Sequence, residues 1–154
     1  MTALLFALFG VASAAQHHLG VAIGGHASQG IKTKIGVQGA DMSLVVRRQG
    51  DGPSGVQLEL HDVWSMSPSG AANLIGIKAG WTRKWGAKTY SLIGAGGYAN
   101  EVMPVLPILW TEAGVELGHG ALRWRVGPEI YSLPPFFVGG GLRVTATTSL
   151  GGTP

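Results

Sequence analysis

From His18 onward, hydrophobic and polar residues alternate along the chain with a period of two. Clusters of Gly, Pro, Asp or Ser interrupt this alternation about every ten to fifteen residues, which is typical of strands joined by turns. The pattern predicts nine candidate strands, at residues 17–26, 30–38, 41–49, 55–64, 71–82, 88–99, 108–118, 121–131 and 136–148. Most exceed the ~5–6 residues of an average soluble strand and suit the ~9–11 residues of a tilted membrane-spanning strand.

The two faces of the predicted strands differ in composition. One face is aliphatic and the other mixes Gly with Lys, Arg and Glu. An aliphatic face points inward in a soluble barrel or sandwich, but outward to lipid in a membrane barrel whose polar face lines the interior. Glycines beside sparse charges of both signs suit a narrow closed interior, so the pattern favours the membrane barrel. The residues expected to face lipid include Leu109, Val115, Leu117, Leu122, Val126, Leu142 and Val144.

The charges on the polar face are of both signs, and buried charges must pair because an unpaired one costs several kcal/mol. We therefore predict a charge network in the lumen. Its expected members are Lys32, Lys34, Glu59, Lys78, Glu112, Glu116, Arg123, Arg125, Glu129 and Arg143. A hairpin at residues 118–120 would place Glu116 opposite residues 122–124. The pairs Arg47–Arg48 and Arg83–Lys84 lie near predicted turns, where they would meet acidic lipid head groups.

Composition narrows the fold class further. The 154 residues include 26 Gly and no Cys, and only 12% are charged, against about 25% in an ordinary soluble domain. So much Gly argues against a helical bundle, because an interior Gly costs about 0.5–1 kcal/mol relative to Ala. A hydrophobic content of 45% with a net charge of +3 argues against disorder. An all-β protein of one domain remains.

The first fifteen residues, MTALLFALFGVASAA, differ from the rest of the chain. A short apolar run leads into Ala12-Ser13-Ala14, which has the form of a signal-peptidase site. We expect residues 1–15 to be a signal peptide and residues 16–154 to form the barrel domain. The alternative is a buried first helix of the domain.

The alternating strands and short turns of residues 17–148 resemble the small Gram-negative outer-membrane β-barrel proteins of the OmpA/OmpX kind. The resemblance implies a closed antiparallel up-and-down transmembrane β-barrel in the cell outer membrane of a Gram-negative bacterium. Such barrels have an even number of strands, so the nine candidates mean eight strands or ten. Eight fits the length of residues 16–154 best, and one candidate is then wrong, either around the weak boundary at Gly39-Ala40-Asp41 or at the N-terminal edge.

Aromatic residues lie mostly near the ends of the predicted strands, as in the interfacial girdles of membrane barrels. The expected girdle residues are Trp64, Trp81, Trp85, Tyr98, Trp110, Tyr131, Phe136 and Phe137. Trp124 lies in the middle of a candidate strand and does not fit this pattern.

The histidines do not form a recognisable metal or catalytic motif. No two have the spacing of a metal-binding motif and there is no Cys, so we expect no metal and no cofactor. His61 with Glu59 and Ser65 or Ser67 is the one local grouping that resembles a Ser–His–acid triad, and a His in the lumen or in a loop is the favoured interpretation.

The expected partner is membrane lipid. The sequence pI near 9.5 could favour nucleic acid, but six of the eleven basic residues lie on the expected interior face. An eight-stranded barrel is filled by side chains, so we expect a structural or interaction role and neither an open pore nor an enzyme. The alternatives are an outer-membrane lipid-modifying barrel enzyme and a soluble β-barrel that binds a small apolar ligand.

Overall fold

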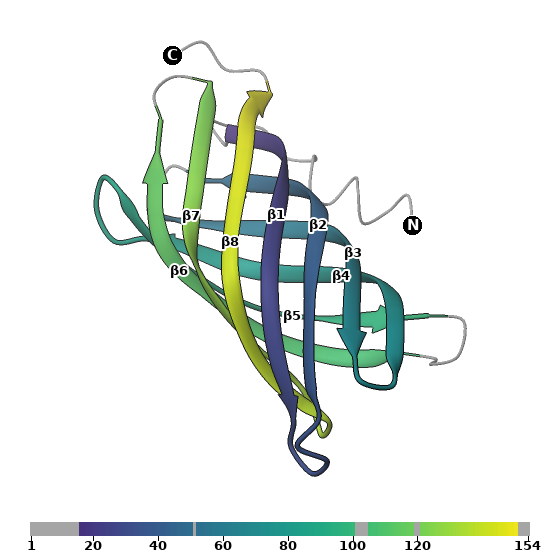
Figure 1. Ribbon diagram of the computed structural model, residues 1–154. Coiled ribbons are helices and arrows are strands. Elements are labelled where there is room, and N and C mark those ends of the chain that lie inside the picture. The colour runs from purple at the N-terminus through teal and green to yellow at the C-terminus, as the bar shows by residue number, and fades with distance from the viewer. Residues whose placement is uncertain (1–15, 51, 101–104, 119–120, 151–154) are drawn as a thin grey trace.

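The computed structural model describes residues 16–50, 52–100, 105–118 and 121–150, so the predicted signal peptide at residues 1–15 lies outside it. Eight strands form a closed antiparallel barrel in which each strand pairs with the next and β8 pairs with β1 (Figure 1). The strands are β1 (Gln16–Gly30), β2 (Gly36–Gln49), β3 (Ser54–Ser67), β4 (Gly70–Lys84), β5 (Thr89–Ala99), β6 (Leu106–Leu117), β7 (Leu122–Leu133) and β8 (Phe137–Leu150). The predicted all-β, eight-stranded, up-and-down barrel is confirmed.

The strands are strongly tilted, as the pairing register shows. A path of paired residues that starts at Leu19 passes once around the barrel and returns to β1 at Gln29, a shear of ten residues. With eight strands, this stagger gives a tilt of about 40° to the barrel axis. Because the strand number is even, β1 begins and β8 ends at the same end of the barrel, the terminal end (Figure 1). The opposite end is called the far end below.

The prediction of separate strands at 30–38 and 41–49 is wrong. Residues 31–35 form the turn between β1 and β2, closed by hydrogen bonds from the Gly30 amide to the Ile35 carbonyl and from the Lys34 amide to the Gly30 carbonyl. Lys34 has a left-handed backbone with φ of 55°, which ends the extended conformation. The boundary at residues 39–41 lies inside the continuous strand β2. The alternating Ile and Lys residues of this segment therefore belong to an exposed turn.

The outer face of the barrel is apolar, and the inner face carries the charges. Ile23 and Leu142 are both 59% exposed, and the residues next to them in sequence point into the barrel. The outer face also carries Leu109, Val115, Leu117, Leu122, Val126 and Val144, as the alternation predicted. Val37 and Gln38 are exceptions, because apolar Val37 lines the interior and polar Gln38 is exposed. Both belong to β2 and follow its alternation. An apolar wall around a polar interior is the arrangement of a transmembrane barrel.

No helix within the described ranges is long and apolar enough to cross a membrane.

Glycines on the inner face let neighbouring strands approach closely. A Cβ atom added to Gly114 or Gly127 would lie well inside van der Waals contact of a carbonyl oxygen on the neighbouring strand. A Cβ atom added to Gly76 would overlap the ring of Tyr98, its partner across β4 and β5. Glycine therefore maintains both the tight curvature of the wall and the space for large interior side chains.

We expect Gly127→Ala to destabilise the barrel, because the new methyl group would collide with the Ala113 carbonyl oxygen. Overpacking of this kind costs about 1–3 kcal/mol. The matched control is Gly25→Ala on the outer face, where the nearest atom, the Gly39 carbonyl oxygen, would lie 4.0 Å from the added Cβ. Urea unfolding in lipid vesicles compares the two free energies of unfolding. Equal effects of the two substitutions would contradict the assignment of the faces.

Candidate functional site in the barrel interior

The charged side chains of the lumen gather in two clusters. The first, the Glu116 cluster, consists of Glu116 with Arg47, Lys84, Arg123 and Arg125. One Glu116 carboxylate oxygen lies 2.8 Å from Lys84 Nζ and 2.9 Å from Arg123 Nη1. The other lies 2.8 Å from Arg125 Nε and 3.2 Å from Arg47 Nη1. A single carboxylate therefore holds four cations from strands β2, β4 and β7.

The second group, the Arg143 cluster, has the opposite composition. Arg143 Nη1 lies 3.2 Å from both Asp41 and Glu129, and Nη2 lies 2.5 Å from Glu59. Lys78 Nζ lies 3.1 Å from Glu129 and 4.0 Å from Glu59, and Glu112 lies 3.8 Å from Arg143 Nε. Two cations thus face four carboxylates, so negative charge predominates in this cluster.

Tyr90 lies between the two clusters. Its hydroxyl group donates a short hydrogen bond to Glu112 of the Arg143 cluster. Its ring carries the guanidinium of Arg125 from the Glu116 cluster at 4.3 Å. Arg125 also donates a hydrogen bond to Thr82, at 3.1 Å. The two clusters therefore form one continuous polar packing, and a cation over the face of an aromatic ring adds to its stability.

The contacts cross the lumen. Arg47 comes from β2 and Glu116 from β6, which are four strands apart and hence on opposite walls of an eight-stranded barrel. Lys78 of β4 similarly reaches Glu129 of β7. Arg47 and Arg143 are each only 1% exposed. At the level of the two clusters, paired side chains therefore occupy both the inner surface of the barrel and the centre of the lumen.

Eight of the ten residues expected in the lumen network lie there: Glu59, Lys78, Glu112, Glu116, Arg123, Arg125, Glu129 and Arg143. Lys32 and Lys34 do not, because they lie exposed in the turn between β1 and β2. Glu116 pairs with Arg125 in the β6–β7 register, one residue beyond the expected range of 122–124.

Sequence reasoning missed Asp41, Arg47 and Lys84. Arg47 and Lys84 were expected at lipid head groups, but both point inward to Glu116. In each adjacent basic pair, alternation puts one member on each face, so Arg48 and Arg83 point outward instead. Extending the alternation of β2 and β4 to their last residues would have identified the inward member of each pair.

The Ser–His–acid grouping is not assembled. The His61 ring makes a short contact with Glu59, but the Ser65 hydroxyl donates to the Ala72 carbonyl and the Ser67 hydroxyl to the Gly70 carbonyl. His61 is buried beside Arg143, with Nε2 at 3.4 Å from Nη2. Within the four described ranges, no group of three or more His, Cys, Asp or Glu is arranged to hold a metal ion.

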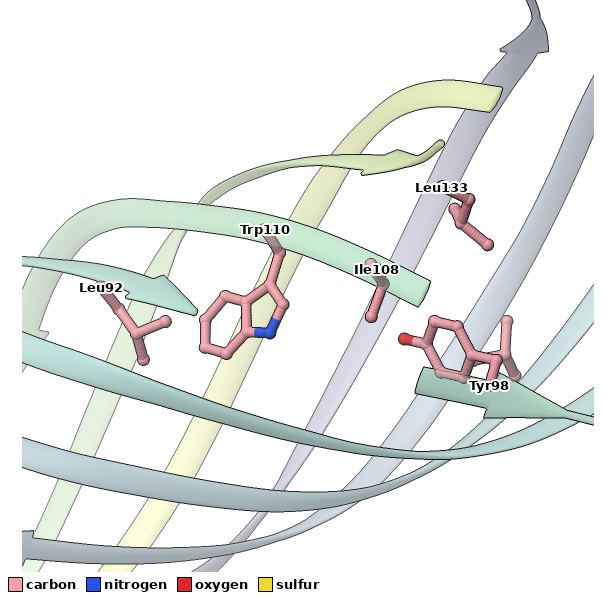
Figure 2. Close-up of a cluster of buried hydrophobic side chains, with 6 residues drawn as sticks. Leu92, Tyr98, Ile108, Trp110 and Leu133 are labelled. Carbon is pink, nitrogen blue, oxygen red and sulfur yellow. The ribbon is translucent and has the colours of Figure 1, made fainter. Parts of the chain in front are cut away.

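Toward the far end, the interior becomes apolar. Leu92, Tyr98, Ile108, Trp110 and Leu133 pack together with Val63 inside the barrel (Figure 2). The girdle prediction is therefore wrong for Tyr98, Trp110, Tyr131 and Phe137, whose side chains belong to or pack on this interior cluster. Trp64, Trp81 and Trp85 are exposed, as expected, and Phe136 is exposed in the turn before β8. Trp124 is exposed too, near the start of β7.

A cavity of about 290 Å³ lies beside this apolar cluster. Val37, Val63, Leu74, Ile108, Leu133 and Phe137 supply much of its apolar wall. Ser65, Ser67 and Ser69 supply hydroxyl groups near the β3–β4 turn, and His26 and Glu129 supply polar groups from the side of the charge network. The interior thus has three zones, which are predominantly cationic, predominantly anionic and apolar.

The fold is similar to that of small eight-stranded outer-membrane barrels. Neisserial surface protein A matches with a TM-score of 0.66 at 9% sequence identity, over 90% of this chain and 100% of that chain. Ail, the attachment invasion locus protein of Yersinia pestis, was solved with the heparin analogue sucrose octasulfate. It matches with a TM-score of 0.54 at 15% identity, over 88% of this chain and 97% of that chain. No protein-family model matches the sequence, and no curated protein matches it.

We expect the ion pairs of the Glu116 cluster to contribute unequally to the stability of the fold. Removing one partner of a buried ion pair typically costs about 3–5 kcal/mol. Glu116→Gln should therefore destabilise the barrel strongly. In double-mutant cycles, Glu116 should couple more strongly to Arg125, whose side chain is 3% exposed, than to Arg123, which is 30% exposed. Urea unfolding in vesicles gives both coupling energies, and near-zero values for both pairs would show that these charges face water.

Proposed function

We propose that this chain is an outer-membrane barrel with a structural or interaction role, whose interior is closed to ion and solute flow. The observation that carries the proposal is the contact of Arg47 with Glu116 across the full width of the lumen. A barrel with opposite walls in direct contact has no continuous water-filled path at that level. The filled interior typical of eight-stranded barrels supports the same conclusion.

The apolar outer face supports placement in a lipid bilayer, and the predicted signal peptide supports export of the chain. For an exported protein with this fold, the bilayer is the outer membrane of a Gram-negative bacterium. The terminal end then faces the periplasm, from which the exported chain inserts, and the far end faces outward. The exposed Lys32 and Lys34 lie at the far end, where they are available to anionic groups outside the barrel.

A role without catalysis is supported by the surroundings of His61. This His is enclosed by Glu59, Asp41 and Arg143, and neither serine of the candidate triad is hydrogen-bonded to it in the described structure. The connections are also short. By the bounds of the strands, the longest connection is the one between β5 and β6. An interaction with a partner would therefore use the barrel ends or the outer wall.

We expect the wild-type protein to show no steady ion conductance in planar lipid bilayers, because paired side chains block the lumen. The double variant Arg47→Ser/Glu116→Ser removes the contact between opposite walls in the Glu116 cluster and should leak small ions above the wild-type background. The Arg143 cluster stays in place and should keep this leak far below the conductance of an open porin. Arg48→Ser is the matched control, because Arg48 is next to Arg47 in sequence and its side chain points outward.

Heat-modifiable migration on gels verifies that each of these proteins is folded before its conductance is compared. A steady conductance of the wild-type protein, at the level of an open porin, would contradict the proposed closed barrel.

A further inference from the structure

We infer that the far-end cavity binds one acyl chain of a membrane amphiphile. This inference goes beyond the proposed closed barrel and rests on its placement in a bilayer. The ionic clusters fill the rest of the lumen with paired side chains, whereas the far end combines apolar walls with open space. Apolar surface that lines a concave cavity is the usual mark of a site for an apolar ligand.

The size of the cavity selects a single chain. Its volume of about 290 Å³ is roughly twice that of the ~150 Å³ engineered cavity that binds benzene. It lies just below the ~300–1,000 Å³ range of small-molecule sites. One flexible hydrocarbon chain suits this space, and a lipid with several chains could place only one of them inside.

The β3–β4 hairpin forms one side of the cavity. Gly70, Ala71, Ala72 and Leu74, at the start of β4, line the cavity and pair with the end of β3. The β3–β4 hairpin is visible at one side of the far end in Figure 1.

The β3–β4 hairpin also borders the lipid-facing wall. The outer side of the same hairpin carries the exposed apolar residues Trp64 and Met66. The lining of the cavity therefore adjoins the lipid-facing wall at this hairpin, where an acyl chain from the bilayer can reach it.

Polar groups around the cavity suit the head-group end of an amphiphile. Ser65, Ser67 and Ser69 place hydroxyl groups along the β3–β4 hairpin. The Ser65 and Ser67 hydroxyls donate to backbone carbonyls, and their oxygens can accept a hydrogen bond from a head-group hydroxyl. Lys32 and Lys34 lie exposed at the same end of the barrel and favour an anionic head group. The ligand class is therefore an anionic membrane lipid or lysolipid that inserts one chain.

The test uses the full barrel in phospholipid nanodiscs with a lysophosphatidylglycerol that carries a photoreactive diazirine near the end of its chain. Mass spectrometry of the cross-linked peptides compares inward residues with their outward neighbours. Leu74 and Ile108 line the cavity, whereas Ile75 and Leu109 face lipid. We expect the inward pair to be labelled, with saturation at one probe per barrel, and the outward pair to be labelled without saturation.

Ala72→Phe fills the cavity and should reduce labelling of Leu74 and Ile108 to background. Ala79→Phe makes the same change on the lipid-facing side of the same strand and should have no effect on it. If Ala72→Phe fails to fold, Ser67→Phe narrows the cavity from its rim instead. Absence of inward labelling in the wild-type protein, or its persistence in a folded cavity-filling variant, would overturn the inference. Neither outcome depends on conductance, so failure of this inference is distinguishable from failure of the closed barrel.

Discussion

A charge removed from water into a narrow barrel loses its hydration and needs an opposite charge at close range. In this lumen, Glu116 meets that need for four cations, and Arg143 does so for four carboxylates. Their partners come from distant strands, so the ion pairs connect opposite sides of the barrel across the lumen. The ion pairs of both clusters form only when the barrel closes with this strand number and this pairing register. A register slip of one residue would turn these charged side chains from the lumen to the lipid-facing side.

The geometry of the wall and the contents of the lumen are also linked. Eight strands with a shear of ten enclose little space, and glycines such as Gly114 and Gly127 allow adjacent backbones to approach where a Cβ would collide. Other glycines, such as Gly76, lie opposite a large side chain. The high Gly content and the low charge content of the chain thus have one cause, since only a few long side chains fit inside and each must be paired.

Most of the fold could be predicted because a period of two reports directly which face a residue occupies. The prediction failed at residues 30–38, where the Ile and Lys residues of a five-residue turn imitate a strand. It also missed Arg47 and Lys84, because the last residues of a strand look like turn residues until the register is known. The inward direction of Tyr98 and Trp110 had no local signal, since an aromatic residue near a strand end suits either an interfacial girdle or an interior core. The contact of Arg47 with Glu116 depends on the closure of the whole barrel, which no local pattern encodes.

The central claim is that the aliphatic face contacts lipid and the charged face lines the lumen. The most direct test is solution NMR of the unmodified protein in nanodiscs, with methyl labelling along β8. We expect nuclear Overhauser effects from lipid acyl chains to the methyl groups of Leu142, Val144 and Ala146, and none to those of Thr145 and Thr147, which point inward. Lipid contacts at Thr145 and Thr147 with none at Leu142 and Val144 would contradict this claim.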